Sequence, residues 1–575
     1  MERIGVFVCY CKLMAYVDNE AVMEAISKKP GVVHAAAYKD LCIAPGLEQV
    51  KDTIKNENLD GVLLTSCSPV LHEHAFRQAI TSAGLEGHQV LVVDIRSHNG
   101  IKENTERAIE VISSALDRLK ASLPPAYTKV PITKKVLVIG GGIAGICASL
   151  DIADGGYEVI LVERTHSIGG HMIQYSETFP TLDCPQCIET PLMTDTGQHP
   201  NINILAYSEI EEVSGSIGKF KVKIRRKATY VDWDKCNGCL MCLEKCPPRV
   251  LSEYERYLDL PKRQAHRRAI WVPHAQAVPM RPIIDKEHCL YFTKGKCQVC
   301  VQTCPNKAID FTQQDRSVEI EVGAIVVASG FDLMPKSAIS EYALDPDILE
   351  GIEFERLLCP AGPTAGKVIR PSDGREPKKV AFISCCGSRD PEHGVPYCSR
   401  VCCMYLVKMA LLYKHAVHDG QAFIFYIDIR TTGKGYEEFV QRAVEEDHIL
   451  YLRGKVSKIF RDGDKIKVWG SDTLTGKRVE MAVDLVVLGM AMLPSEGVKE
   501  LASKLGIATD EYGFMVELHP KLSPLESSVP GIYLAGCCQG SKDIQDSVAQ
   551  GGGAASKVLA LFAQDEVVLE KAVTG

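Results

Sequence analysis

Eight cysteines of the 575-residue chain occur in two runs whose spacing is typical of proteins that bind iron–sulfur clusters. The first run is Cys-x2-Cys-x2-Cys-x3-Cys-Pro over residues 236–247, and the second, over residues 289–305, has an enlarged gap after its first cysteine. In paired runs of this kind the last cysteine of a run ligates the other cluster. We therefore expect two 4Fe–4S clusters rather than zinc, with Cys236, Cys239, Cys242 and Cys304 holding the first and Cys289, Cys297, Cys300 and Cys246 holding the second.

A third group of cysteines lies in the short stretch from residue 385 to residue 403. If residues 397–415 form one helix, Cys398 and Cys402 lie four residues apart on the same face. A cysteine at the end of the preceding apolar strand could join them, and the sequence leaves open whether Cys385 or Cys386 does so. This group supplies enough thiolate for a further 4Fe–4S cluster.

A fourth group of cysteines follows the expected strands at the start of the chain. Cys9 and Cys11 end one strand, Cys42 lies in a loop, and Cys67 ends another strand. The ends of parallel strands converge at one edge of an open sheet, so these side chains could share a site. We predict a 4Fe–4S cluster here, with four unconnected thiols as the alternative.

The remaining cysteines carry weaker signals. Cys184 and Cys187 lie in TLDCPQCIETPLM, where they could be cluster ligands, a redox dithiol or part of a short structural turn. Cys147 and Cys359 are isolated, and we expect them to be buried and inert, because a lone thiol behaves as a small apolar residue.

The stretch from residue 135 to residue 164, which contains a glycine-rich turn, predicts a dinucleotide site. The stretch reads as strand, G-x-G-x-x-G turn, helix and second strand. Gly140 permits the tight turn, Gly142 lets the backbone approach a pyrophosphate, and Gly145 lets the helix pack closely on the strand. The helix N-terminus then faces the phosphates, and Glu163 at the end of the second strand can bond the ribose hydroxyls.

Three further patterns favour FAD over NAD as the dinucleotide. Gly169 and Gly170 follow Glu163 closely, and Ala-Ser-Gly ends a strand at residues 328–330, as in flavoproteins with two dinucleotide domains. Residues 531–555 resemble their C-terminal flavin segment, although Cys537 stands where an aspartate usually binds the ribityl chain. The predicted FAD-binding residues are Gly140, Gly142, Ile143, Ala144, Gly145, Glu163, Arg164, Gly170, Ala328, Ser329, Gly330, Gly536, Asp543 and Ile544.

A second nucleotide-binding half lacks this fingerprint. Its expected first strand, KKVAFI at residues 378–383, is followed by SCCGSRD rather than by a glycine turn. We expect that this half does not bind NADPH, and that electrons enter and leave through protein partners.

The elements that position these residues fit an α/β protein of several domains. The charge of −8 gives no electrostatic case for nucleic acid, and without an export signal or a long apolar run we expect a cytoplasmic chain whose 23 cysteines serve metal or redox chemistry. We predict an N-terminal α/β domain at 1–125, an FAD domain at 134–228 and 313–575 with its degenerate half at 378–490, and an inserted ferredoxin domain at 229–312.

Over nearly its whole length the chain resembles HdrA, the A-type subunit of heterodisulfide reductase. The resemblance rests on VFVCYC, SCSP, GGGIAGICASL, TLDCPQC, the two cysteine runs, KVIRPSDG, SCCGSRD, YCSRVCCMYLVK and AGCCQGSKDIQDSVAQG. It implies a thioredoxin-reductase-like FAD domain with an inserted two-cluster ferredoxin domain and an N-terminal cluster domain. It further implies that Lys408 is a catalytic residue at the reactive edge of the flavin, and that Cys385, Cys398, Cys402 and Cys403 hold the third cluster.

The resemblance also implies partners and an activity. Many members of the family end in a second ferredoxin domain, and we expect this chain to lack one. The partners would be proteins similar to HdrB and HdrC of heterodisulfide reductase, an electron-input subunit of the hydrogenase or formate dehydrogenase type, ferredoxin and a second copy of the chain. The implied activity is flavin-based electron bifurcation or confurcation, with a plain electron relay or a thiol–disulfide oxidoreductase using Cys184 and Cys187 as alternatives.

Overall fold

The computed structural model describes residues 1–10, 17–66, 69–95, 101–122, 127–252 and 266–570. The chain divides into two compact units, one made of residues 1–129 with the stretch from Val568, and one made of residues 130–567. Within the described ranges, none of the helices combines the length and apolar composition needed to cross a membrane.

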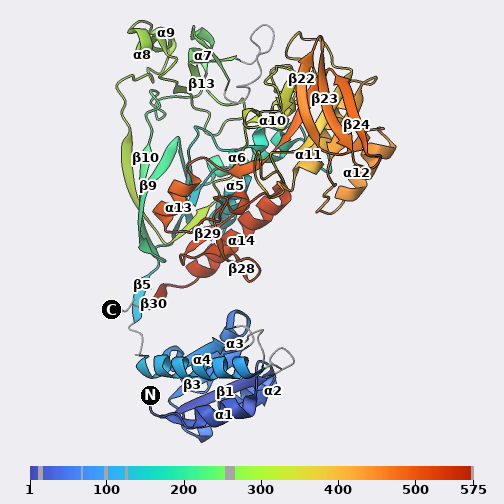
Figure 1. Cartoon of the computed structure of the whole chain (residues 1–575). Helices are drawn as coiled ribbons and strands as arrows, with labels where there is room; N and C mark the ends of the chain where they lie inside the picture. Colours follow the sequence, from blue (N-terminus) through green and yellow to red (C-terminus); the bar gives the residue numbers. More distant parts are fainter. Residues whose placement is uncertain (11–16, 67–68, 96–100, 123–126, 253–265, 571–575) are drawn as a thin grey trace. The chain divides into compact units, whose positions relative to one another are not determined.

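The first unit, drawn in blue in Figure 1, is built on a parallel sheet. Its strand order is β2-β1-β3-β4. Helices α1 and α4 bury apolar residues such as Ile26 and Ile112 against one face, and α2 and α3 bury Ile54 and Phe76 against the other. The apolar runs of the sequence are thus buried parallel strands, as predicted. The elements are β1 (Ile4–Tyr10), α1 (Asn19–Ser27), β2 (Val32–Lys39), α2 (Ala44–Asn56), β3 (Gly61–Ser66), α3 (Pro69–Ser82), β4 (Val90–Asp94) and α4 (Ile101–Ala121).

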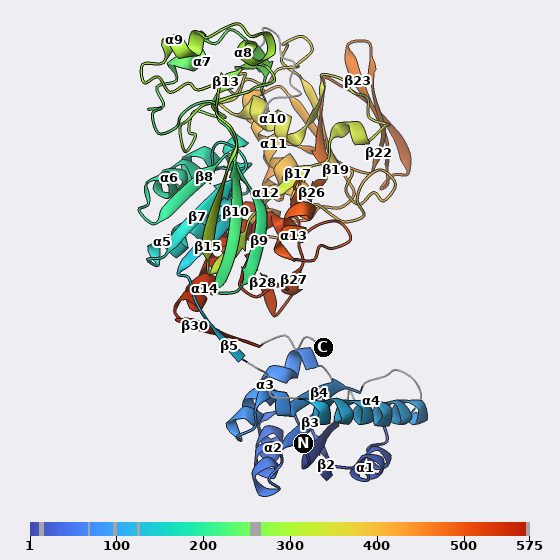
Figure 2. The ribbon, with the colours of Figure 1, turned by 90° about the vertical axis from the view of Figure 1, so that its left-hand side faces the viewer.

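The second unit contains a seven-stranded sheet in the order β27-β28-β29-β16-β6-β7-β8. Helices α5, α6 and α14 cover one face, and the three-stranded sheet β15-β10-β9 covers the other together with α13 (Figure 2). The elements are β6 (Lys135–Ile139), α5 (Ile143–Asp154), β7 (Glu158–Glu163), α6 (Pro185–Gln198), β8 (Ile202–Ala206), β9 (Ser208–Ser216), β10 (Lys219–Arg226), β15 (Arg316–Val322), β16 (Ala324–Val327), α13 (Val498–Leu505), β27 (Glu517–His519), β28 (Ser523–Ser527), β29 (Ile532–Leu534) and α14 (Ile544–Phe562).

The same three-layer plan recurs around a five-stranded parallel sheet in the order β18-β25-β19-β20-β21. Helices α10, α11 and α12 cover one face, and the antiparallel sheet β22-β23-β24 covers the other. The elements are β18 (Ile348–Glu350), α10 (Gly351–Leu358), β19 (Lys379–Cys386), α11 (Cys402–Ala416), β20 (Gln421–Tyr426), α12 (Tyr436–Glu445), β21 (Leu450–Arg453), β22 (Val456–Asp462), β23 (Lys465–Asp472), β24 (Lys477–Val483) and β25 (Leu485–Met490).

The cysteine-rich segment leaves and re-enters this unit at neighbouring points. Strands β10 and β15 pair antiparallel, with Arg226 opposite Arg316, so the intervening residues extend from one end of a strand pair (Figure 2). An insertion at such a point leaves the sheet pairing intact. The elements in the described part of the segment are short: α7 (Met241–Lys245), β11 (Arg249–Leu251), β12 (His266–Arg268), β13 (Ile270–Trp271), β14 (Ile283–Ile284), α8 (Leu290–Lys294) and α9 (Val299–Thr303).

Candidate functional site

The turn between β6 and α5 has no room for side chains at two of its glycines. A Cβ at Gly140, whose φ is +107°, would lie 2.2 Å from the carbonyl oxygen of Ala328. A Cβ at Gly145 would lie 1.9 Å from the carbonyl oxygen of Gly140. The crossing of β6, α5 and the end of β16 therefore requires glycine at both positions.

The third glycine of the turn borders open space. Gly142 is the N-cap of α5, and the nearest atom to a Cβ placed there is the Cα of Gly170, at 3.9 Å. Ile143 and Ala144 are the first helical residues, so their N–H groups have no partner within the helix. This cradle of two glycines and a helix N-terminus fits a pyrophosphate.

Glu163 at the end of β7 organises the next part of the site. One carboxylate oxygen accepts the N–H of Gly141 at 2.7 Å, and the other accepts the N–H and hydroxyl of Thr165, each at 2.8 Å. Gly140, Glu163, Arg164 and Ser329 line a common cavity of about 1220 Å³. A carboxylate fixed at the rim of a nucleotide-sized cavity is what ribose binding requires.

A polar atom without a hydrogen-bond partner in the described part of the chain, the hydroxyl oxygen of Ser329, lies just after the end of β16. The hydroxyl of Ser329 is buried and has no hydrogen-bond partner among the described residues. Gly330, which follows it, has φ +72°. An orphaned hydroxyl beside a glycine cradle is consistent with a ligand that completes the site.

The C-terminal flavin segment supplies a second helix N-terminus. Asp543 is the N-cap of α14 and accepts the N–H of Asp546 at 2.8 Å, and Ile544 begins the helix. Gly536, with φ +71°, begins the short turn before it. Cys537 does not replace the missing aspartate as an acceptor, because its buried thiol donates to the carbonyl oxygen of Lys542 at 3.5 Å. FAD therefore fits the glycine cradle, the Glu163 carboxylate and both helix N-termini, without a carboxylate at residue 537.

Lys408 lies on α11 and is almost completely buried, with 2% of its surface exposed. Its ammonium forms an ion pair with the equally buried Glu355 on α10 and donates to the carbonyl oxygen of Glu177 at 2.7 Å. Glu355 in turn accepts the backbone N–H of Ser176 at 3.0 Å and its hydroxyl at 2.7 Å. Adjacent residues 176 and 177 thus hydrogen-bond to both members of the buried ion pair, which supports such a pair in its buried position.

Glu355 and its partners were not predicted from the sequence. The helix GIEFERLL is buried along most of its length, and spacing alone does not distinguish Glu355 from the other acids in it. The available signal was chemical, since a lysine predicted to lie in a buried site needs an acid beside it. Tyr175 also lies near the pair, with its ring 5.8 Å from the ammonium, and burial raises the pKa of its phenol.

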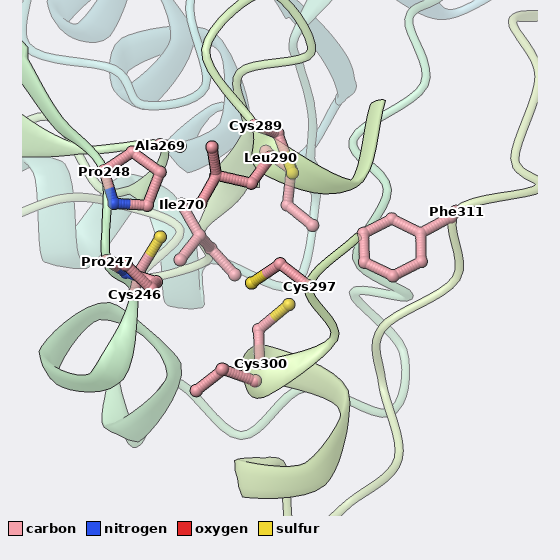
Figure 3. Close-up of a pocket in the computed structure, with 12 residues that line it drawn as sticks. Cys246, Pro247, Pro248, Ala269, Ile270, Cys289, Leu290, Cys297, Cys300 and Phe311 are labelled. Atoms are coloured by element: carbon pink, nitrogen blue, oxygen red, sulfur yellow. The ribbon is translucent and has the colours of Figure 1, made fainter. Parts of the chain in front are cut away.

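The structure groups the eight cysteines of the inserted segment into two sets of four. One cavity is lined by the thiols of the predicted second cluster, and Figure 3 shows their sulfur atoms around the shared space. Another cavity is lined by those of the predicted first cluster. The two sets are Cys246, Cys289, Cys297 and Cys300, and Cys236, Cys239, Cys242 and Cys304.

The cavities suit a cluster better than a single metal ion. Among the described residues no three His, Cys, Asp or Glu side chains converge closely enough to hold one ion. In a 4Fe–4S cluster each cysteine binds a different iron, so its ligands stand further apart. Burial raises the pKa of Cys242 and of Cys300 to about 12, so these thiols need a metal to ionise near neutral pH.

The third cysteine group gathers at the end of β19. The thiol of Cys402 hydrogen-bonds to those of Cys385 and Cys403, which lowers the pKa of these two and raises that of Cys402. Cys398 lies near Arg389, as does Cys385. Cys386 points the other way, donates to the carbonyl oxygen of Ile383 at 3.2 Å and packs in the core beneath the sheet.

One expectation about this group was wrong. The helix predicted over residues 397–415 begins only at Cys402, so Cys398 precedes the helix and does not lie on its face. The chain turns sharply before the helix instead, with Arg400 at φ +62° and the thiol of Cys398 accepting its N–H at 3.3 Å. Residues 397–401, most of which are weak helix formers, thus form a turn before the helix.

The N-terminal group is only partly described. Cys9, near the end of β1, is buried, and Cys42 packs against the same apolar cluster. Cys11 and Cys67 lie outside the described residues. The structure thus brings two of the four predicted ligands to one region of the sheet edge.

Cys184 and Cys187 are joined in a disulfide at the N-terminus of α6. Cys359 and Cys147 were both expected to be buried. Cys359 is buried, whereas Cys147 is half-buried. Burial also raises the pKa of Cys147 to about 11, which leaves it a neutral thiol.

Comparison with known proteins gives the class of this site. Residues 135–184 match a model described as FAD dependent oxidoreductase, and residues 229–252 match one described as 4Fe-4S binding domain. Among solved structures, thioredoxin reductase from T. acidophilum is similar at 13% identity and a TM-score of 0.42, over 75% of this chain and 100% of that chain. The chain is an FAD- and 4Fe–4S-containing oxidoreductase of the α/β class.

Full-length relatives define the family. The chain is 41% identical to the A-type subunit of the H(2):CoB-CoM heterodisulfide,ferredoxin reductase of Methanothermobacter marburgensis, over 99% of this chain and 86% of that protein. It is 42% identical to the A-type iron-sulfur subunit of the CoB--CoM heterodisulfide reductase of Methanocaldococcus jannaschii, over 99% of this chain and 87% of that protein. It belongs to the HdrA family of heterodisulfide reductase subunits.

Proposed function

We propose that this chain bifurcates or confurcates electron pairs within a heterodisulfide-reductase-like complex in the cytoplasm. Two relatives carry names that combine a heterodisulfide, ferredoxin and either H2 or H2/formate. The proposed partners are accordingly subunits that deliver electrons from such a donor, subunits that reduce a disulfide-type acceptor, and ferredoxin. When bound, FAD supplies the ability to accept two electrons together and to release them singly.

The buried pair of Lys408 and Glu355 is the observation that carries the proposal. A buried cation strongly favours added negative charge nearby, because the surroundings screen it weakly. Glu355 offsets that charge while no electrons are present, and Ser176 and Glu177 fix the positions of both groups.

The cysteine sets would hold the one-electron carriers. Two sets lie in the inserted segment and one at the end of β19 on the unit that holds the FAD cradle, and a fourth is proposed in the first unit. Residues 385–403 stand where the second nucleotide-binding turn would be, which supports electron exchange through clusters rather than through a nicotinamide. The protein's part is to bind these groups and to set their potentials by burial and hydrogen bonding.

A stepwise reductive titration followed by EPR and visible absorption separates this proposal from a plain relay. We expect the flavin to take up two electrons together, with no organic radical signal above a trace. A relay that moves electrons singly predicts instead a large flavin radical signal at half reduction, and that result would overturn the proposal.

A further inference from the structure

Among the described residues, the disulfide between Cys184 and Cys187 lines none of the three cavities of the second unit described above. Its Cα atoms are 5.2 Å apart, and Cys184 is the N-cap of α6 with Pro185 in the first turn. Cys187 is exposed, whereas Cys184 is half-buried. Exposed disulfides in chains that otherwise carry thiols are typically redox-active rather than structural.

The helix N-terminus makes one of the two sulfurs a good leaving group. The sulfur of Cys184 accepts the backbone N–H of Cys187 at 3.2 Å. Donated N–H groups and the positive end of a helix stabilise a thiolate at the N-cap. Attack on the exposed sulfur of Cys187 would therefore release Cys184 as the stabilised thiolate, which is the faster direction of exchange.

A short loop joins this disulfide to the buried ion pair. Residues 176–183 run from the clamp on Glu355 and Lys408 to Cys184 without an intervening helix or strand. The loop is closed on itself, since Thr178 and Asp183 bond through their backbones at 2.8 Å. A change at Cys184 thus reaches the carbonyl oxygen that accepts from Lys408 across one compact turn.

A second contact leads from the disulfide to the same ion pair. The amide of Gln186, between the two cysteines, donates to the thiol of Cys359 at 3.2 Å and to the carbonyl oxygen of Ile173 at 3.1 Å. Cys359 caps α10, and its N–H bonds to the backbone oxygen of Glu355 at 2.9 Å. The loop of residues 176–183 and the contact between Gln186 and Cys359 therefore both connect the disulfide to Glu355, the partner of Lys408.

We propose that Cys184 and Cys187 form a redox-active disulfide that exchanges with an external dithiol and reports its state to the Lys408–Glu355 pair. One thiolate of the external dithiol attacks the sulfur of Cys187, forms a mixed disulfide and expels Cys184 as a thiolate. The second external thiol then attacks the mixed disulfide and releases Cys187 as a thiol. The pair gains two electrons, the external dithiol becomes a disulfide, and two protons pass from it to the products.

The test equilibrates the anaerobically purified full-length protein, with its FAD and clusters, in buffers of reduced and oxidised dithiothreitol. Differential alkylation and mass spectrometry then give the oxidised fraction of the pair. We expect Cys184 and Cys187 to change together in a single two-electron transition, and Cys147→Ser to leave that transition in place. Repeating the reduction with a small protein dithiol at the same potential distinguishes the reductants: faster reduction indicates a protein, and equal rates indicate a small thiol.

A second readout tests the link to the flavin site. At fixed flavin oxidation state, the visible spectrum of bound FAD should differ between the disulfide and dithiol forms, and Cys184→Ser or Cys187→Ser should abolish the difference. The proposal is overturned if both residues stay alkylated as thiols in every oxidising buffer. It is also overturned if Cys184→Ser lowers the iron content by about four per chain, because the cysteines would then be cluster ligands. Exchange does not require electron splitting, so failure here leaves the proposed function standing.

Discussion

The sheet around β6 and the sheet around β19 share one architecture, with helices on one face and a three-stranded sheet on the other. They differ in the residues that follow the first strand. After β6 the chain carries Gly140, Gly142 and Gly145, whereas the end of β19 carries Cys385 and then Cys386. The same scaffold therefore presents backbone N–H groups in one half and thiols in the other.

The two turns have similar backbone conformations at the strand end. Gly140 has φ +107° and Cys385 has φ +60°, so both strand ends enter the left-handed region. For a residue with a side chain this conformation costs about 1–2 kcal/mol. A cysteine held there despite that cost points to a functional constraint on its side chain.

The helices that follow the two strands, α5 and α11, also differ in the residues that they bury. The buried residues of α5 are small or apolar apart from Ser149, whereas α11 buries Lys408. One half thus offers an uncharged helix N-terminus for phosphates, and the other buries a lysine that is paired with Glu355. In the function proposed above, the second half carries cluster ligands and Lys408 where a nucleotide site would otherwise lie.

The largest expected effect separates the two neighbouring cysteines of β19. Cys385→Ser should lower the iron content by about four per chain, because one 4Fe–4S cluster loses a ligand. Cys386→Ser is the matched control and should retain all iron, since its thiol faces the core. Iron analysis of the two variants side by side makes the comparison, and equal iron in both would contradict the assignment.

The next effect concerns the buried ion pair of the second half. Lys408→Met leaves the carboxylate of Glu355 buried and unpaired, which should destabilise the protein by about 3–5 kcal/mol. The double variant Lys408→Met/Glu355→Gln should recover most of this loss, because no charge is then left alone. Chemical denaturation measures both, and a double variant as unstable as the single one would show that the pair is not the cause.

A smaller effect is expected at the tight turn of the first half. Gly145→Ala forces a Cβ against the carbonyl oxygen of Gly140, and overpacking of this kind costs about 1–3 kcal/mol. The cost should be present in protein stripped of FAD, because the clash is with the protein itself. Thermal unfolding of that form tests it, and an unchanged midpoint would refute the packing argument.

The smallest expected effect is that of Gly142→Ala, which should change the affinity for FAD without changing the stability of the FAD-free protein. A Cβ at Gly142 meets no atom closer than 3.9 Å, so Gly142→Ala should leave the FAD-free protein as stable as before. It should nevertheless weaken FAD about tenfold, or about 1.4 kcal/mol, because the methyl group occupies the space for the pyrophosphate. Titration with FAD measures this, with Gly145→Ala as the contrasting variant.

The sequence predicted the fold class well because its signals are local. Strand, glycine turn and helix at residues 135–164 follow from apolar runs and fixed glycine spacing, and the match to family models agrees. The pairing of cysteines from the two runs, such as Cys304 with Cys236, was likewise anticipated from spacing, and the structure brings them to one cavity. Which cluster each of these cysteines ligates stays a prediction.

The remainder of the site depended on contacts between distant segments. Glu355 meets Lys408 across 53 positions of the chain, and no spacing rule connects α10 with α11. The turn before Cys402 was missed because the helix that begins there was extended back over residues 397–401, most of which are weak helix formers. The choice between Cys385 and Cys386 also needed the structure, since only the twist of the strand end shows which thiol faces Cys402.

Iron and FAD content of the anaerobically purified full-length protein tests the central claim most directly. Four cysteine sets and one glycine cradle predict about 16 Fe and one FAD per chain, with four clusters of the ferredoxin type. A content of about 8 Fe with one FAD would mean that only the two clusters of the inserted segment are present. That result would contradict the assignment of a cluster to the end of β19, and with it the view that the second half exchanged a nucleotide for iron.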